Sequence, residues 1–225
     1  MTVELNDNPS LGWEKGLEVK MAWDKCLDLN VSRKGRECWH AQSMGVPDLP
    51  PLLAPNLERY LGWLDRWNRT HALTALPPGE RWEELVLDAA ALLPFLEDLP
   101  AGARVADFGT GMGSPAVVLA LARPDLHILG VDAAGKKIAF LRQVVLELQL
   151  PNLEPVQGRL EALPPLRAHL GVAKALGSLE QLVGWWSRHG LETSRFLALK
   201  GPDWQREGLP SGWRAVAHHL WSSAP

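Results

Sequence analysis

The segment ADFGTGMGSP, residues 106–115, is the clearest indication of the class of fold. An apolar segment, RVADF (104–108), precedes it and PAVVLALA (115–122) follows it, so the glycines lie where a strand turns into a helix. Glycine adopts positive φ angles without strain and lets a ligand approach the backbone closely. The turn holds three glycines, Gly109, Gly111 and Gly113. This order of strand, glycine turn and helix is typical of a nucleotide-binding α/β domain.

The alternation of strands and helices continues toward the C-terminus. Further strand candidates are HILGVD (127–132), LEPVQG (153–158), LGVAKAL (170–176), RFLALKG (195–201) and WRAVAHHLW (213–221). Helical segments are expected between them at about 134–150 and 178–189. Strands that alternate with helices indicate a parallel sheet. The predicted fold class is therefore α/β, a Rossmann-like sheet flanked by helices, with an N-terminal helical extension.

The chain before the glycine turn divides into two parts. Residues 1–45 carry no sustained apolar period and are expected to be a poorly ordered or loosely attached leader, and Met44 is an alternative start. Residues 46–100 are expected to be helical, because apolar residues recur at helical spacing over about 56–68 and 79–96. The predicted catalytic domain then spans residues 101–225.

Composition narrows the class of protein. The chain is 46% hydrophobic and 22% charged, which is ordinary for a soluble domain, and its net charge of −3 gives no molecule-wide field toward nucleic acid. Only two cysteines occur, Cys26 and Cys38, and with His40 they lack the close pairs and the fourth ligand of a zinc site. No apolar run reaches membrane-spanning length. A cytoplasmic monomer without a metal is expected.

Two acidic residues are candidates for cofactor binding. Asp107, at the end of the first strand, can accept hydrogen bonds from a cationic or amino-bearing ligand and suits a sulfonium cofactor. Asp132 ends the next strand, where an acid binds the ribose hydroxyls of an adenosine cofactor; the alternative is an N-cap for the helix near Gly135. Ser114 stands where a dinucleotide fingerprint needs its third glycine, so NAD or FAD is the less favoured ligand.

From about Tyr60 to Gly201 the chain resembles the glucose-inhibited division protein B, or RsmG, family of 16S rRNA guanine-N7 methyltransferases. Two segments make the resemblance more specific than the glycine turn alone, KKIAFLRQV (136–144) and NLEPVQGRLE (152–161). The resemblance implies S-adenosylmethionine as cofactor and transfer of its methyl group to N7 of a guanine in 16S rRNA, nucleotide 527 in the family. The family's cofactor contacts fall on Gly109, Ser114, Leu160, Glu161 and Lys174.

The sequence departs from the family pattern at several positions. Lys174 replaces an arginine, which keeps the charge and loses the planar guanidinium. Ala72, Leu85 and Ala116 replace the family's polar, basic and glycine residues, and the final strand is expected to be missing or irregular. Two alternatives therefore remain: a degenerate member that binds cofactor or RNA with little activity, and a methyltransferase acting on another RNA or a small molecule.

Guanine N7 carries a free lone pair at neutral pH, so its methylation needs no general base. No catalytic residue is predicted, and the site acts by placing two bound reactants. Lys174 is a candidate contact to guanine O6 or to the cofactor. The predicted partner is 16S rRNA or the small-subunit particle. The candidates for RNA binding are Lys136, Lys137, Arg142 and Arg159, joined by Arg66 and Arg69, and the alternative is that they are solvated surface charges.

Overall fold

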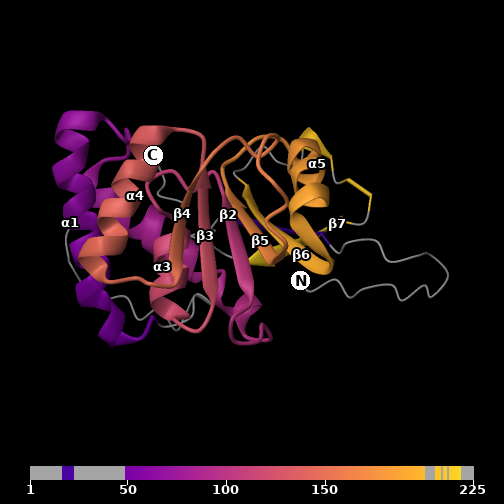
Figure 1. The fold of residues 1–225 in the computed structure, drawn as a ribbon, viewed down its shortest axis with the longest axis horizontal. Coiled ribbons are helices and arrows are strands. Elements are labelled where there is room, and N and C mark those ends of the chain that lie inside the picture. The colour runs from indigo at the N-terminus through magenta and orange to yellow at the C-terminus, as the bar shows by residue number, and fades with distance from the viewer. Residues whose placement is uncertain (1–16, 23–48, 201–205, 209, 212, 219–225) are drawn as a thin grey trace, which may run out of the picture.

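A parallel seven-stranded sheet forms the centre of the molecule in a computed structural model that describes residues 17–22, 49–200, 206–208, 210–211 and 213–218. The strand order is β4-β3-β2-β5-β6-β1-β7 (Figure 1). The strands are β1 (Leu17–Ala22), β2 (Arg104–Phe108), β3 (His127–Asp132), β4 (Leu153–Gln157), β5 (Ala168–Lys174), β6 (Gly190–Lys200) and β7 (Trp213–His218). The predicted α/β class is thereby confirmed.

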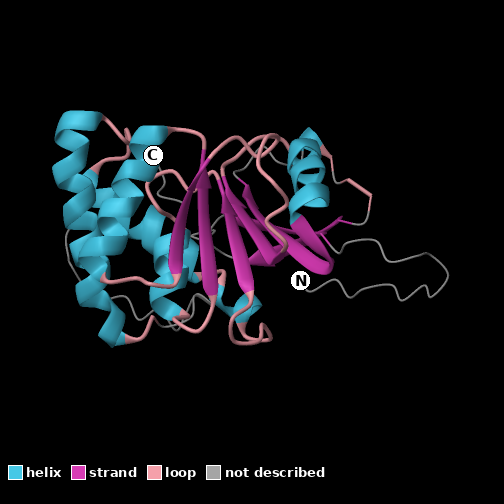
Figure 2. Ribbon diagram, in the orientation of Figure 1, coloured by secondary structure: helices cyan, strands magenta, loops and turns pink. Residues whose placement is uncertain are grey.

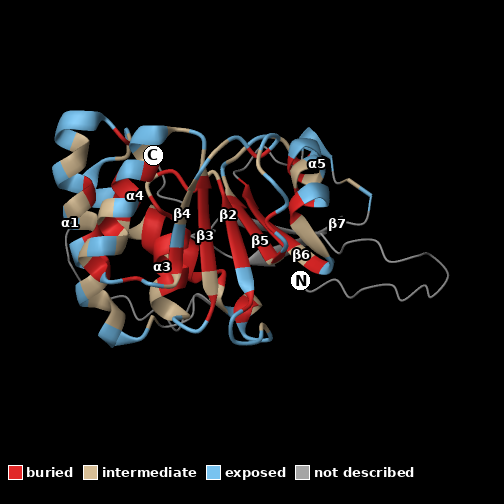
Figure 3. Ribbon diagram, viewed as in Figure 1, coloured by how far each residue is buried: buried red, intermediate tan, exposed pale blue. Residues whose placement is uncertain are grey.

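Helices cover both faces of the sheet (Figure 2). They are α1 (Ala54–His71), α3 (Ala116–Ala122), α4 (Gly135–Leu148) and α5 (Leu179–His189). Alternate strand residues face opposite layers, so Val105 packs with α1, α3 and α4, while its neighbour Ala106 packs with α5. The buried residues line both faces of the central strands (Figure 3). Burial on both faces explains why these strands are apolar almost throughout.

The segment before β2 differs from the continuous helix expected at about 79–96. This segment consists of four short pieces: η3 (Pro78–Glu80), the π-helical turn η4 (Trp82–Leu87), α2 (Asp88–Ala90) and η5 (Leu93–Leu96). A further 3-10 turn, η2 (Pro51–Leu53), precedes α1. Pro94, in the first turn of η5, lacks the N–H that would continue a helix. The prediction of one helix was therefore wrong, although its apolar face does pack on the domain through Leu85 and Leu92.

Strands β1 and β7 complete the sheet beyond β6. Strand β1 comes from the segment expected to be a leader, and it pairs in parallel with β6 on one side and β7 on the other. Strand β7 confirms the strand candidate at 213–221 over Trp213–His218, so the expectation of a missing or irregular final strand was wrong. The rest of the predicted leader, Cys26, Cys38 and His40 included, lies outside the described residues.

Candidate cofactor site

A cavity of about 490 Å³ lies at the carboxyl ends of β2, β3 and β5, where parallel sheets bind their ligands. The glycine turn between β2 and α3 forms one side, with Gly109 and Gly111 at φ of 69° and 57°. Its lining residues are Leu85, Gly109, Thr110, Gly111, Met112, Ser114, Val131, Asp132, Ala133, Lys137, Gly158, Arg159, Leu160, Glu161, Lys174, Ala175, Leu176 and Trp185. Seven of the predicted cofactor residues thus meet around one space: Gly109, Gly111, Ser114, Asp132, Leu160, Glu161 and Lys174.

Asp132 joins the end of β3 to the glycine turn. Its Oδ2 accepts a hydrogen bond from the Gly111 N–H at 3.0 Å and lies 3.7 Å from Lys137 Nζ, while Oδ1 accepts from the Ala134 N–H at 2.8 Å. Helix α4 takes Ala134 as its N-cap residue and has no side-chain cap, so the N-cap alternative for Asp132 does not apply. Each carboxylate oxygen can accept two hydrogen bonds, which leaves capacity for a ligand.

The loop 158–167, which carries Leu160 and Glu161, is held by α5. His189 is buried, its Nε2 lies 2.8 Å from the Leu160 carbonyl oxygen, and its Nδ1 accepts from the Leu166 N–H at 3.3 Å. These two bonds require a neutral ring protonated on Nε2. Burial lowers the pKa of His189, with Arg188 acting in the same direction and the Leu160 carbonyl opposing, which favours that neutral form.

Trp185, from the same helix, fixes the side chain of Glu161. Its indole Nε1 donates to Glu161 Oε1 at 2.9 Å, and the ring itself lines the cavity. Its neighbour Trp186 is fully buried in the core, whereas Trp185 is partly buried and packs at the edge of the same cluster. Trp185 lies one position earlier on the helix, and that rotation turns it from the core toward the cavity.

Lys174 lies between the cavity and an acidic cluster on η4 and α2. Its Nζ is 2.7 Å from Asp88 Oδ2 and 3.9 Å from Glu84 Oε2, and it donates to the Glu84 carbonyl oxygen. Burial raises the pKa of Asp88, against the lowering effect of Lys174. Burial, followed by the charge of Asp88, likewise raises the pKa of Glu84. The π-helical turn thus supplies Glu84 beside Lys174 and, through Leu85, an apolar part of the cavity lining, while Asp88 comes from the start of α2.

Two predicted cofactor residues, Asp107 and Gly113, do not line the cavity. Asp107 is fully buried beneath the turn, where Oδ2 accepts from the Ala116 N–H at 3.1 Å and Oδ1 has no hydrogen-bond partner among the described residues. Burial raises the pKa of Asp107 to about 7, although Thr110 and the Ala116 N–H lower it. A Cβ at Gly113 would lie 2.8 Å from Val117 Cγ2, so this glycine serves close packing. Their direct contact with cofactor stays a prediction.

The basic candidates separate into two kinds. Lys137 and Arg159 line the cavity itself, whereas Lys136 donates to the His71 and Ala72 carbonyl oxygens at the end of α1. Arg142 is exposed on α4 and forms no ion pair within the part of the chain that the structure describes.

Residues that the sequence did not single out also line the cavity, notably Thr110, Met112, Ala133 and Leu176. The first three follow directly on predicted residues in the turn or after β3, so proximity in sequence was a usable signal. Leu176 had none, because only the fold brings the end of β5 to Gly109, where a Cβ would lie 2.8 Å from Leu176 Cδ1.

Neither a cluster of metal ligands nor a membrane-spanning helix occurs among the described residues. No group of three or more His, Cys, Asp or Glu side chains there could hold a metal ion. None of the helices described is both long and apolar enough to cross a membrane.

The fold and the cavity together define a Rossmann-like α/β protein with an adenosyl-cofactor site. The family model described as rRNA small subunit methyltransferase G matches residues 54–215. The chain therefore belongs to the rRNA small subunit methyltransferase G, or GidB, family. It is a methyltransferase, and its cofactor is S-adenosylmethionine.

Curated relatives carry the same name. The chain is 40% identical over 169 residues to ribosomal RNA small subunit methyltransferase G of Cronobacter sakazakii, covering 73% of this chain and 80% of that protein. The protein of that name from Serratia proteamaculans is 40% identical over 171 residues, with 73% and 80% covered.

Solved structures give more distant matches. Precorrin-6y C5,15-methyltransferase from Geobacter metallireducens matches with a TM-score of 0.41 and 19% identity, over 51% of this chain and 65% of that one. Coclaurine N-methyltransferase bound to N-methylheliamine and SAH matches with a TM-score of 0.42 and 12% identity, over 66% and 54%.

Proposed function

We propose that this protein transfers the methyl group of S-adenosylmethionine to N7 of a guanine in small-subunit 16S rRNA, the family's nucleotide 527. The observation that carries the proposal is the family match over residues 54–215, which spans the cavity and all the predicted cofactor residues. The partner is the rRNA, free or within the small-subunit particle, and the protein acts on it as a monomer in the cytoplasm.

The cavity fits the cofactor. Its volume of about 490 Å³ lies within the usual range of small-ligand pockets. Acidic residues, Asp132 and Glu161, lie on the same lining as apolar ones such as Met112 and Leu176, as an adenosyl group with ribose hydroxyls requires. A Cβ at Gly111 would meet only the Gly109 oxygen at 3.7 Å and Lys137 Nζ at 3.9 Å, so the space beside the turn is open to a ligand.

The residues of this chain bind and orient the reactants. Asp132 would bind the ribose hydroxyls through its remaining lone pairs, and the Gly109–Gly111 backbone and Ser114 would hold the rest of the cofactor. The bound cofactor supplies a methyl group on a positively charged sulfur. Lys174, held by Asp88, would donate to guanine O6 and fix the position of the base in the cavity. Positioning of this kind lowers a barrier by about 7–11 kcal/mol.

The RNA backbone is bound around the mouth of the cavity by Arg159, Lys137 and Lys136, and along α4 by Arg142. Lys137 and Arg159 line the cavity, and Lys136 and Arg142 lie on α4, the helix that carries Lys137. Phosphate contacts by Lys and Arg are independent of sequence and set the orientation of the RNA.

The first experiment is calorimetric titration with S-adenosylmethionine, together with tritiated-methyl transfer to small-subunit rRNA from cells that lack their own copy of this activity. Binding, with label in 7-methylguanine at one position, is the expected result. Binding without transfer to any RNA would favour the degenerate alternative, and methylation of free guanosine or metabolites at a comparable rate would favour a small-molecule enzyme. Free 16S rRNA and intact small subunits, assayed in parallel, identify the form that is methylated.

A further inference from the structure

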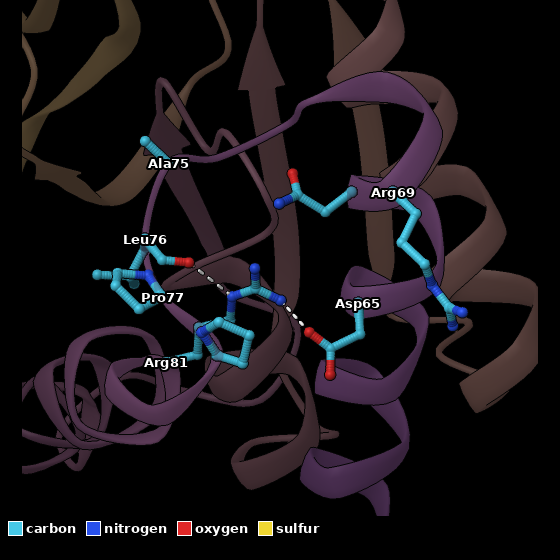
Figure 4. Close-up of a pocket in the computed structure, with 8 residues that line it drawn as sticks. Asp65, Arg69, Ala75, Leu76, Pro77 and Arg81 are labelled. Carbon is cyan, nitrogen blue, oxygen red and sulfur yellow. Dashed lines mark hydrogen bonds and ion pairs between the residues drawn. The ribbon is translucent and has the colours of Figure 1, made fainter.

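A second pocket lies outside the cofactor site, between α1 and the segment that follows it (Figure 4). Its volume is about 500 Å³, similar to that of the cofactor cavity. The lining residues are Asp65, Asn68, Arg69, Ala75, Leu76, Pro77, Pro78 and Arg81. None of them lines the cofactor cavity.

The pocket is preformed by hydrogen bonds between its two sides. The Asn68 side chain donates to the Thr74 carbonyl oxygen at 3.0 Å and accepts from the Thr74 N–H at 2.9 Å. Arg81 Nε donates to the Leu76 carbonyl oxygen at 3.0 Å, and its Nη1 pairs with Asp65 Oδ1. These bonds hold the segment 72–78 in place, so a ligand would pay little entropy for ordering it.

Arg81 is the polar group that points to a ligand. The residue is 3% exposed, and its Nη2 forms no hydrogen bond with any described residue. Figure 4 shows this nitrogen directed into the space between Leu76 and α1, away from both bonded partners. This nitrogen is not among the fully buried atoms, so it is a donor that faces the pocket and is available to an acceptor on a ligand.

The other groups around Arg81 complete a pattern. Asp65, whose side chain is 48% exposed, has Oδ2 free of described partners and offers only acceptors. Ala75, Pro77 and Pro78 add an apolar side to the pocket. Arg69 also lines the pocket and pairs with no acid among the described residues, and in Figure 4 its guanidinium extends along α1, away from Arg81 and Leu76. The pocket therefore presents a donor beside acceptors, an apolar side, and a cation on the adjoining surface of α1.

Guanine has the complementary edge. Its O6 accepts, and its N1–H and N2–H₂ donate, side by side in that order, so Arg81 Nη2 matches O6 and the Asp65 carboxylate matches the two donors. Adenine and uracil lack the adjacent pair of donors. Proteins that read RNA by sequence take unstacked bases into such pockets and bind them along the Watson–Crick edge.

The pocket lies close to the cofactor site along the chain and in space. Arg81 precedes Leu85, which lines the cofactor cavity, by one turn of η4. On the other side, α1 ends at His71, whose carbonyl oxygen accepts from Lys136, the neighbour of the cavity residue Lys137. A strand of RNA passing the cofactor site would thus reach both pockets.

We propose that this second pocket binds an unpaired guanine nucleotide of the RNA substrate, distinct from the methylated guanine, with Asp65 and Arg81 reading its base and Arg69 its phosphate. The proposal rests on the proposed function, because RNA is the source of the nucleotide. It makes the pocket a determinant of which RNA segment is methylated.

The test measures the binding of nucleoside monophosphates to the full chain saturated with S-adenosylmethionine. Binding is detected through changes in the amide chemical shifts of the protein. GMP is expected to shift the signals of Arg69 and Ala75, with IMP binding more weakly because it lacks the N2 amino group, and AMP and UMP weaker still. Asp65→Asn keeps an oxygen that can accept from Arg81, and it should lower the affinity for GMP by about 10-fold or more. Arg69→Gln should lower the affinity for GMP and leave the affinity for guanosine, which has no phosphate, unchanged. Glu58→Gln and Arg167→Gln remove the same charges elsewhere and should change neither affinity.

RNA methylation gives an independent measurement. Asp65→Asn should raise the KM for rRNA with little change in kcat or in the affinity for S-adenosylmethionine. No shift with GMP up to about 10 mM, or equal binding of GMP and IMP, overturns the proposal while rRNA methylation by the native chain still supports the proposed function. Selective GMP binding by a chain that methylates no RNA rejects the proposed function alone. Should Asp65→Asn fail to fold, the comparison of GMP with IMP and the Arg69→Gln variant decide the matter.

Discussion

The carboxylate of Asp88 holds the ammonium group of Lys174 at 2.7 Å, and both side chains are largely buried. The lysine lies at the end of β5 and the acid follows the π-helical turn, so the pair joins the N-terminal segment to the edge of the cofactor cavity. Such a pair is costly to break, because the remaining partner keeps a buried charge without a counterion.

Lys174→Met should therefore lower both stability and activity. The free energy of unfolding should fall by about 2–4 kcal/mol, and the rate of rRNA methylation by at least about 10-fold, because the donor to guanine O6 is lost. Urea unfolding and single-turnover methyl transfer measure the two effects. Asp88→Asn combined with Lys174→Met should cost less stability than the sum of the single changes. Wild-type methylation by the Lys174→Met variant would remove the residue from the site.

Asp107 should make stability depend on pH. Its pKa is raised from 3.8 to about 7 by burial, so the folded protein retains a proton that the unfolded chain releases. The contribution of this proton to the free energy of unfolding is present below about pH 4 and is lost as the pH rises to about 7. Asp107→Asn should remove most of that decline in urea unfolding at a series of pH values. Asp125→Asn is the control, because the lowered pKa of Asp125 gives stability that is lost as the pH falls.

The same group reports whether Asp107 contacts the cofactor. A direct contact with the cofactor's amino group would ionise the Asp107 carboxyl. The binding of S-adenosylmethionine near pH 6 would then release a proton from Asp107. Calorimetry in two buffers with different ionisation enthalpies counts that proton. Binding without proton release would leave Asp107 as a support beneath the glycine turn, bonded to the Ala116 N–H.

His189→Gln should loosen the loop 158–167. Glutamine can keep the donor to the Leu160 carbonyl oxygen but not the acceptor for the Leu166 N–H, which should cost about 1–3 kcal/mol of stability. The Kd for S-adenosylmethionine should rise because Leu160 and Glu161 lose their fixed positions. The pKa of His189 is lowered below 6.5, so its contribution to stability is present above about pH 6.5 and is lost as the pH falls. An unchanged Kd would show that the loop is held without the histidine.

Charge reversal tests the RNA surface. Arg142→Glu and Arg159→Glu should each weaken rRNA binding and reduce the slope of log affinity against log salt by about one unit. Arg167→Glu, a change of the same charge on a loop outside the cofactor cavity, should leave the slope unchanged. Arg159 lines the cavity, so the affinity for S-adenosylmethionine must be measured for that variant as well. Unaltered slopes for both arginine variants would make them ordinary solvated charges.

Local pattern predicted the central strands well. The apolar segments that became β2 and β3 are buried on both faces, and the glycine turn between β2 and α3 has the positive φ angles that its glycines suggested. These features depend on neighbours in sequence, which is why sequence alone suffices for them.

Other features depend on contacts between distant segments. Whether Asp107 faces a ligand or the inside of the turn is decided by the packing of α3, and the placement of Trp185 is decided by the rotation of α5. The neighbours Lys136 and Lys137 looked equivalent, yet only the second lines the cavity, because the first is taken up by the end of α1. No periodicity in the sequence reports these choices.

Helix α1 is bonded to the cofactor domain at three places. Tyr60 donates its hydroxyl to the Met112 carbonyl oxygen in the glycine turn, at 2.9 Å, and Lys136 and Arg59 connect the two ends of the helix with those of α4. The helix and the turn should therefore open and close as one cooperative unit, so amide hydrogens of α1 exchange more slowly once cofactor is bound. The shortest fragment that still binds S-adenosylmethionine must then begin before Ala54, even though every predicted cofactor contact lies more than fifty residues farther along the chain.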